Sequence, residues 1–526
     1  MHAKYILALI GAAAAGPLEG LRGGLERRGV SPIPPLQIAK GEKFIGAPTV
    51  AKPLDARVAF SPNAMNMHQD GGNTGTIDLP GPLGKDLKLT TAVGGLHILL
   101  WTRKGQMVVG YTTLSLSGLK WGIAAVGEDM SVQAEWYPEV DGQTLNVAYM
   151  ELMLETNELV VTSKEGQIYI IKVKEDDEKP SLELQQMINL TSTLGKGEML
   201  MNAMYDSEQN LWFSSGGLRE NGGHGDSAQN SSTIGYLEKG GMGVIHELHI
   251  EDQMIENGIA VDGTTAYVIT GPSGKQDKAG AKGYFIAFGP GKDKSLTTHW
   301  NVTYDAGDKK KPGSFSRGSG ATPALMGDQY VAMTDAKEGQ SQLVIYHQKA
   351  QKDAESQVVC SVPVFPETGS KIDIAPLVHK QGDTYSVYLC NGYNAPPLFY
   401  ADTGTLNGKW NNLTQMTPGV ARIDVSSEGK CNIAWEKDDL RIQSVPIIST
   451  KNGLVYGYTQ AEEFTEDGLY VWYIVALDYR TGEEVWRIRA GAGGTFNDDF
   501  QPGALGPDGS FYQSVIGGLI RLQDGA

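Results

Sequence analysis

Short apolar runs alternate with turns along almost the whole chain, and residues 473–522 show this pattern most clearly. An apolar run at 474–477 is followed by a turn at 478–482 and then by 483–488, where polar and apolar residues alternate, as in a β-hairpin. A second turn at 507–509 precedes two further short runs. We therefore expect four short strands in about fifty residues, the size of one propeller blade.

The same unit recurs upstream as a turn that contains Gly, Asn or Asp, followed by a short strand of β-branched or aromatic residues. Its turns lie at Lys104-Gly105, Thr156-Asn157, Gln209-Asn210, Asp262-Gly263, Gly327-Asp328, Gly382-Asp383, Asn452-Gly453 and Asp508-Gly509. A period of roughly 50 to 70 residues is typical of a propeller or solenoid. We expect an all-β fold, a single β-propeller of eight four-stranded blades over residues 41–526. The alternative, a large β-sandwich or two barrels, does not explain this period.

The N-terminal residues have the pattern of an export signal. Lys4 precedes an apolar stretch at 5–15 that is too short to span a bilayer and ends in small residues. We expect a signal peptide at 1–17 and, at 18–40, a flexible linker or pro-segment rich in Gly, Pro and Arg. Arg27-Arg28 fits either a dibasic processing site or two solvated arginines. The mature protein should be secreted or lie in the lumen of the secretory pathway.

Composition and charge exclude some function classes. The chain has 526 residues with 67 Gly and 24 Pro, which suits an all-β protein with many turns. A net charge of −17 argues against nucleic-acid binding, since phosphate contacts need basic patches. The basic runs at 275–282 and 309–311 lie in loop-like sequence, so we interpret them as solvated loop charge. We expect no membrane partner and a monomer.

Cysteines and sequons add covalent expectations. The three cysteines allow three pairings; we favour Cys360 with Cys431, which leaves Cys390 buried as a small apolar residue. No Cys/His cluster has the spacing of a zinc site. N-glycosylation sequons, which also arise by chance, occur at Asn189, Asn230, Asn301 and Asn412.

Candidate site residues are polar or aromatic groups that interrupt the strand pattern, because propellers bind ligands where their inner strands converge on the central channel. For catalysis we select His68, Glu151, Asn202 and Asn257; for substrate binding, Trp121, Met201, Met204, Tyr393 and Phe496. Each has a structural alternative: a hydrogen-bonded histidine, a carboxylate at a strand end, or apolar core. No GxSxG, P-loop or HExxH motif is present, and no metal site is expected.

The turn that begins at Asn257 (NGIAVDG) resembles one in the gluconolactonase-like propellers, where this Asn binds a catalytic divalent metal. A strand-initiating Asn-Gly turn is the alternative.

Longer motifs carry a wider resemblance. VALDYRTGEEVW and LGPDGSFY, with GSGATPALMGDQYVAMTD, NGIAVDG and PGVARIDV, resemble the exported quinoprotein-like propellers over nearly the whole mature chain. That resemblance implies eight blades. Quinoprotein dehydrogenases also have an adjacent Cys-Cys pair over pyrroloquinoline quinone and Asp/Glu/Asn calcium ligands. This sequence has no adjacent cysteines, which puts quinone binding in doubt.

One branch that this chain resembles is the fungal hetero-Diels-Alderases of tropolone-sesquiterpenoid (meroterpenoid) biosynthesis, which need no cofactor. The resemblance implies a cyclase that holds small apolar substrates in one orientation. Two alternatives remain open: a propeller enzyme dependent on a divalent metal or quinone (a lactonase or oxidoreductase), and a non-catalytic secreted binding protein.

Overall fold

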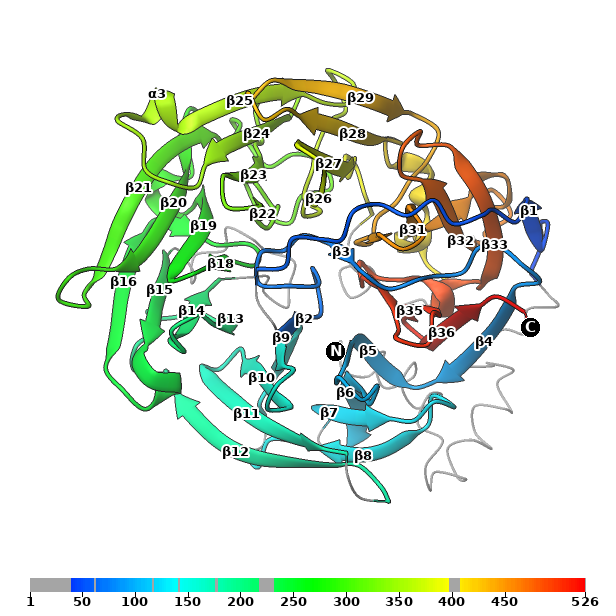
Figure 1. Cartoon of the computed structure of the whole chain (residues 1–526), viewed down its shortest axis with the longest axis horizontal. Helices are drawn as coiled ribbons and strands as arrows, with labels where there is room; N and C mark the ends of the chain where they lie inside the picture. The colour runs from blue at the N-terminus through cyan, green and yellow to red at the C-terminus, as the bar shows by residue number, and fades with distance from the viewer. Residues whose placement is uncertain are drawn as a thin grey trace.

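The computed structural model describes residues 39–60, 63–115, 118–140, 142–175, 178–216, 231–396 and 407–525. Its strands form eight sheets arranged around a central axis (Figure 1). The predicted eight-bladed β-propeller is therefore confirmed.

Blades 1 to 4 follow one another along the chain. Blade 1 contains β5 (Gly95–Trp101), β6 (Met107–Ser115), β7 (Gly118–Val126) and β8 (Val132–Trp136). Blade 2 contains β9 (Leu145–Met153), β10 (Glu158–Ser163), β11 (Gln167–Lys174) and β12 (Ser181–Asn189). Blade 3 contains β13 (Leu200–Tyr205), β14 (Leu211–Ser215), β15 (Ser231–Leu237) and β16 (Ile245–Glu251). In blade 4 the inner strand is split into β17 (Gln253–Met254) and β18 (Ala260–Asp262), followed by β19 (Thr265–Pro272), β20 (Lys282–Pro290) and β21 (Leu296–Asp305).

Blades 5 to 8 complete the ring. Blade 5 contains β22 (Ala324–Met326), β23 (Tyr330–Thr334), β24 (Gln342–His347) and β25 (Val358–Pro363), with the short α3 (Ala354–Gln357) before its last strand. Blade 6 contains β26 (Leu377–Gln381), β27 (Thr384–Cys390), β28 (Val420–Val425) and β29 (Cys431–Lys437). Blade 7 contains β30 (Ile447–Ser449), β31 (Leu454–Ala461), β32 (Val471–Asp478) and β33 (Glu484–Ala492). Blade 8 contains β34 (Gly503–Leu505), β35 (Phe511–Val515), β36 (Gly518–Gln523) and β4 (Lys88–Val93).

The predicted turns fall at one structural position. Each of the eight turns joins the first and second strands of a different blade, from Lys104-Gly105 between β5 and β6 to Asp508-Gly509 between β34 and β35. The four strands expected at 473–522 are present, but they divide between blades 7 and 8 and do not form one blade. The sequence pattern locates the turns, whereas the grouping of strands depends on which neighbours pair.

The ring is closed by strands from both ends of the chain. β4 pairs antiparallel with β36, so the outermost strand of blade 8 comes from the N-terminal part of the chain. β1 (Phe44–Gly46) adds an edge strand to β33 of blade 7. Closure of this kind leaves the ring without a gap between first and last blades.

Neighbouring blades pack through large aromatic side chains. Tyr456 and Phe511 stack between blades 7 and 8 with ring centroids 5.7 Å apart. Tyr330 and Tyr385 make an edge contact at 5.8 Å between blades 5 and 6. These contacts bury the apolar faces of sheets that are exposed to solvent only at their edges.

Residues 63–78, here called the channel segment, cross the centre of the ring (Figure 1). They contain β2 (Ala64–Met65), which pairs with β9, and β3 (Thr76–Ile77), which pairs in parallel with β30. Between them the Asn73 side chain donates to the carbonyls of Ile259 (2.9 Å) and Pro323 (3.0 Å). The segment thus joins the inner strands of several blades and closes part of the channel.

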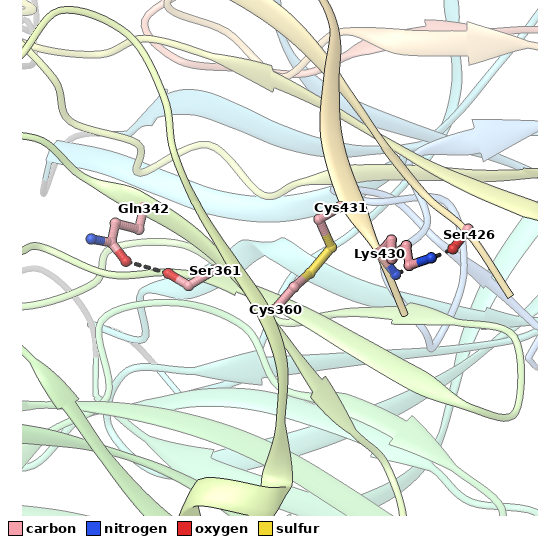
Figure 2. Close-up of a disulfide and its surroundings, with 6 residues drawn as sticks. All are labelled: Gln342, Cys360, Ser361, Ser426, Lys430 and Cys431. Carbon is pink, nitrogen blue, oxygen red and sulfur yellow. Dashed lines mark hydrogen bonds between the residues drawn. A yellow bond between two sulfur atoms is a disulfide. The ribbon is translucent and has the colours of Figure 1, made fainter. Parts of the chain in front are cut away.

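A disulfide links two blades at the rim. Cys360 in β25 bonds to Cys431 in β29, which confirms the favoured pairing (Figure 2). Cys390 is a buried free thiol, as expected. Beside the bond, Ser361 donates to Gln342, and the Lys430 amide donates to the Ser426 hydroxyl (Figure 2). The outer strands of blades 5 and 6 are therefore joined covalently.

Several N-terminal and covalent expectations stay predictions. The proposed signal peptide, Arg27-Arg28, most of the linker and Asn230 lie outside the described residues. Asn189 and Asn301 are exposed and Asn412 is half-buried. Among the described residues, no helix has the length and apolar character that crossing a membrane requires.

Candidate functional site

A cavity of about 300 Å³ lies on the propeller axis. All eight blades line it, mainly through the beginnings of their inner strands and the loops that lead into them. Most of the walls are apolar, with Ile98, Met199, Met201, Phe315, Met416 and Phe500 among the larger side chains. This is the position and lining expected of a small-molecule site in a propeller.

The channel segment forms the floor of this cavity. Met67 and His68 line the cavity. Further along the segment, the side chains of Asn73 and Thr76 donate hydrogen bonds to the carbonyls of Ile259 and Val378. The backbone amide of Val378 donates to Thr74 (2.7 Å) and that of Leu325 donates to Gly72 (2.8 Å). A segment that precedes the first complete blade in the chain therefore lines one side of the site.

Two aromatic residues of the cavity wall contact each other. The rings of Phe315 and Phe500, from the loops before blades 5 and 8, make an edge contact at 5.2 Å. Asp499 and Phe500 have φ values of 45° and 65°, in the left-handed region that few non-glycine residues adopt. Backbone strain of this kind persists only where surrounding contacts impose it, and it gathers at functional sites.

The break in the inner strand of blade 4 brings a carboxyl group to the cavity. β17 ends at Met254 and β18 begins at Ala260, so Glu256 and Asn257 lie in irregular backbone between them. Both line the cavity. Glu256 is buried, and its Oε2 accepts a hydrogen bond from the Ser316 amide at 2.9 Å.

Blade 6 supplies a second acid and a cation beside Glu256. Lys371 and Asp373, two residues apart before β26, form an ion pair at 2.6 Å. The Lys371 ammonium also donates to the Gly313 carbonyl at 2.6 Å, and only 4% of its side chain is exposed. We call Glu256, Lys371 and Asp373 the acid cluster.

Gly320 leaves the space in which the two carboxyl groups of the acid cluster approach each other. A Cβ atom at this position would lie 2.4 Å from Glu256 Oε1 and 2.6 Å from Asp373 Cγ. Either distance is shorter than a real Cβ contact, so only glycine fits without a shift of the carboxyl groups.

Burial decides the protonation of Glu256. Loss of hydration and the nearby Asp373 carboxyl raise the pKa of Glu256 to about 8, against the lowering influence of Lys371. The carboxyl is therefore mostly protonated at neutral pH. It is an acid that can donate a hydrogen bond or a proton inside a largely apolar cavity.

His68 has the opposite property. Burial lowers its pKa to about 3, so the ring is neutral at ordinary pH. Its Nε2 lies 3.2 Å from the Thr322 hydroxyl, and its Nδ1 is buried without a hydrogen-bond partner among the described residues. A neutral imidazole at this place can orient a substrate by a hydrogen bond, but it carries no charge.

Buried atoms of two other cavity-lining residues share this lack of partners. Like His68 Nδ1, the atoms Glu256 Oε1 and Gln443 Oε1 are buried and have no hydrogen-bond partner within the described part of the chain. Buried polar atoms are nearly always satisfied, so each of these three atoms needs a partner other than the described residues.

The structure brings three of the nine predicted site residues to the cavity: His68, Met201 and Asn257. The Asn257 amide is already engaged, since it accepts from the Tyr149 hydroxyl and donates to the Gly320 carbonyl. Its position fits a structural connector between blades 2 and 5.

The other six predicted residues lie outside the cavity lining. Glu151 accepts from Asn63 (2.9 Å) and from the Tyr205 amide (2.8 Å) between blades, where burial raises its pKa to about 7. Asn202 donates to the Ser214 hydroxyl at 2.9 Å. The remaining four pack in or beside the apolar cores or flank the lining residues: Trp121, Met204, Tyr393 and Phe496.

Sequence reasoning did not single out Glu256 or Lys371. Glu256 directly precedes Asn257, which the sequence pattern did select. Nothing in the local sequence shows that the inner strand is interrupted at this point. Lys371 and Asp373 are spaced by two, which places both on one face of an extended chain. Their approach to Glu256 depends on the ring closing blades 4 and 6 around the same axis.

Comparisons with known proteins support the fold. No protein family matches the chain. An uncharacterized protein of Archaeoglobus fulgidus is 25% identical over 246 residues, which cover 44% of this chain and 46% of that protein. The chain therefore matches about half the length of this relative.

Two solved structures are similar across most of the chain. The quinohemoprotein alcohol dehydrogenase from Comamonas testosteroni has a TM-score of 0.53 at 11% identity, and ADHIIG from Pseudomonas putida HK5 has 0.50 at 10%. Each match covers 89% of this chain and 82% of the other. At such identities the similarity shows a quinoprotein-like propeller fold.

The cavity residues do not fit the calcium ion of quinoprotein dehydrogenases. Calcium takes six to eight oxygen ligands. Here the Lys371 ammonium already pairs with the Asp373 carboxylate, and both ends of the Asn257 amide are engaged. The described residues contain no group of three or more His, Cys, Asp or Glu side chains placed to hold a metal.

Proposed function

We propose that this protein is an enzyme that binds small, largely apolar substrates in the central channel and catalyses an acid-assisted cyclisation. The most specific form of the proposal is an intermolecular hetero-Diels-Alder addition in secondary-metabolite biosynthesis. The observation that carries it is the buried Glu256 carboxyl, whose pKa is raised by that burial, in a largely apolar cavity on the propeller axis. Its location, and not only its chemistry, supports the proposal, because all eight blades contribute to the wall that would orient the substrates.

The cavity meets the physical needs of such an addition. A hetero-Diels-Alder reaction forms one carbon–carbon and one carbon–oxygen bond, and no atom enters or leaves. Part of its activation free energy comes from the translational and rotational freedom that the two partners lose when they align. A preformed pocket that holds both partners lowers that part. Side chains such as Met201, Phe315 and Phe500 would supply the apolar surface that excludes water.

Glu256 would act on the oxygen of the heterodiene. A hydrogen bond from its protonated carboxyl withdraws electron density from that oxygen and makes the heterodiene more reactive towards an alkene. His68 would orient a polar group of the substrate from the floor of the cavity. Lys371 and Asp373 would hold the position of the acid without contact with the reacting atoms.

The proposal is tested by incubating the purified protein with an o-quinone methide generated in solution and with humulene as the alkene. We expect a single stereoisomer of the adduct, formed faster than in buffer. Glu256→Gln should lower the rate about 10²-fold, the lower end for loss of a general acid. Glu151→Gln is the matched control, a buried glutamate outside the cavity, and should keep the rate of a folded protein.

Two results would reject the enzyme proposal. An adduct with the same rate and isomer ratio as in buffer would show no catalysis, and binding of the alkene without product would favour the non-catalytic binding protein. An unchanged rate in Glu256→Gln would remove Glu256 from the mechanism.

We also propose that the protein acts outside the cytoplasm. The Cys360–Cys431 disulfide supports this, because disulfides persist mainly in oxidising compartments. Expression in a secreting host, followed by N-terminal sequencing of the exported protein, tests the predicted signal peptide at 1–17. Retention of residues 1–17 on the mature protein would reject it.

A further inference from the structure

Two lysine-bearing loops that are separate in sequence meet at the junction of blades 4 and 5. One loop follows β19 and carries Lys278; the other links β21 to β22 and carries Lys309 and Lys310. Together they line a second cavity of about 300 Å³, distinct from the one on the axis. The sequence alone suggested solvated loop charge at both places, but the fold concentrates it around one hollow.

Arg317 holds these loops together beneath the cavity. It is buried, and its guanidinium donates to the Asp277 carboxylate (2.9 Å) and the Lys278 carbonyl (2.8 Å) of one loop. Its Nε donates to the Gly307 carbonyl of the other loop at 3.1 Å. A further link runs from the Gly280 amide to Asp308 at 2.9 Å. The lysines therefore project from loops that are already ordered.

The charge balance of the lining is positive. Its basic residues are Lys278, Lys309, Lys310 and Arg317, and its acidic residues are Asp277 and Asp308. Arg317 is neutralised by its ion pair with Asp277. Among the described residues, the three lysines form no ion pair, and Asp308 is the remaining acid of the lining, with the Glu338 carboxylate 3.4 Å from its amide and Glu256 in electrostatic range of Lys310.

The neighbouring lysines behave differently. Lys311 turns inward and donates to the Ser341 hydroxyl and the Ser370 carbonyl, both at 2.9 Å. Lys282 lies 3.9 Å from the Asp305 carboxylate. Of the lysines in the runs 275–282 and 309–311, Lys278, Lys309 and Lys310 line the cavity, together with Arg317. In a chain with a net charge of −17, such a local surplus of positive charge stands out electrostatically.

We propose that this cavity binds a tetrahedral oxyanion, phosphate or sulfate, either free or as the ester group of a small molecule. Lysine ammonium groups bind such anions as point charges. The volume lies at the lower end of small-molecule pockets, so it has room for an ester as well as for an ion. Ser316 and Pro272 also line it.

Isothermal titration calorimetry of the full-length protein at low ionic strength tests this site directly. The probes are inorganic phosphate, inorganic sulfate, glucose 6-phosphate and, as an uncharged control, glucose. We expect saturable binding of the anions, weakening with added salt, and none of glucose. Equal affinities for phosphate and its ester would identify the free ion as the ligand, whereas tighter binding of the ester would identify a phosphorylated molecule.

The double variant Lys309→Met/Lys310→Met should bind the anions at least tenfold more weakly. Lys349→Met/Lys352→Met removes two exposed lysines elsewhere and serves as the matched control, which should bind as the wild type does. Thermal unfolding of both variants checks the fold. Anion binding that the double variant retains in full, or no saturable binding by the wild type, would overturn the proposal. Because binding is read without turnover, the result is independent of the proposed reaction in the channel.

Discussion

Replacing Glu256 by Gln gives a prediction whose magnitude follows from the structure. The pKa of this carboxyl is about 8 in the folded protein and 4.5 when the group is freely exposed. A difference of that size corresponds to roughly 5 kcal/mol, at 1.36 kcal/mol for each pKa unit. Burial in the cavity and the adjacent Asp373 are the two causes, and both act only in the folded state.

The sign follows from proton binding. Below pH 4.5 the carboxyl is protonated in the folded and the unfolded chain alike. Between pH 4.5 and about 8 only the folded chain keeps the proton, so stability falls as the pH rises through this window and levels off above it. Glutamine does not ionise. The wild type should therefore lose about 4 kcal/mol relative to Glu256→Gln between pH 5 and pH 9.

Urea unfolding followed by tryptophan fluorescence at several pH values measures this difference. The comparison of the two proteins is needed because Glu151 and Asp498, both with a pKa raised by burial to about 7, titrate in the same range. Their contributions are common to both proteins and cancel. Glu151→Gln should show a smaller effect, which levels off once the pH has passed about 7.

A difference in stability that does not change with pH would refute this reasoning. It would mean that Glu256 is already ionised in the folded protein at neutral pH. The carboxyl could then not act as an acid, and the proposed mechanism would fail with it.

Three further predictions concern the site and its support. Gly320→Ala should abolish the channel activity while the protein stays folded, because the new Cβ would displace the carboxyl groups of the acid cluster. The control is Gly392→Ala in the same cavity, where a Cβ would make only ordinary contacts from 3.7 Å. Equal activities in the two variants would contradict this account. Asn73→Ala should lower the free energy of unfolding by roughly 2 to 4 kcal/mol, because two buried carbonyls lose their hydrogen-bond donor and because alanine tolerates the φ of 57° at this position less well than asparagine. A loss of less than about 1 kcal/mol in a urea titration would argue against a supporting role of the channel segment. Cys360→Ser/Cys431→Ser should lower the free energy of unfolding by up to about 4 kcal/mol, the chain-entropy value for a cross-link that spans 71 residues. An unchanged unfolding midpoint under oxidising conditions would show that this disulfide does not limit unfolding.

The fold was predictable because the repeating signal is local. Each turn such as Asp262-Gly263 or Asn452-Gly453 needs particular residues for its own backbone, independently of the rest of the chain. Eight such turns at a regular period therefore predict the number of blades without any long-range contact. The Cys360–Cys431 pairing was also chosen correctly, but the sequence offered two alternatives and only the adjacent outer strands of blades 5 and 6 distinguish them.

The site was much less predictable. His68, Met201 and Asn257 were selected because polar or flexible groups interrupt a strand pattern, and they do line the cavity. The same criterion selected Glu151 and Phe496, which are buried elsewhere, since an interrupted strand has the same local signature whether it faces the axis or a neighbouring blade.

What the sequence determined by itself is thus the all-β character, the eight repeats and the turn positions, because backbone preference and side-chain alternation act over a few residues. Only the tertiary structure decided that the channel segment closes one side of the cavity, that Glu256 meets Lys371 and Asp373, and that Lys278 lies beside Lys309 and Lys310. Each of these groupings joins residues from different blades or distant loops. Their chemistry depends on the closed ring. The pKa of Glu256, for example, is raised by burial and by the nearby Asp373 carboxyl, and both act only in the folded protein.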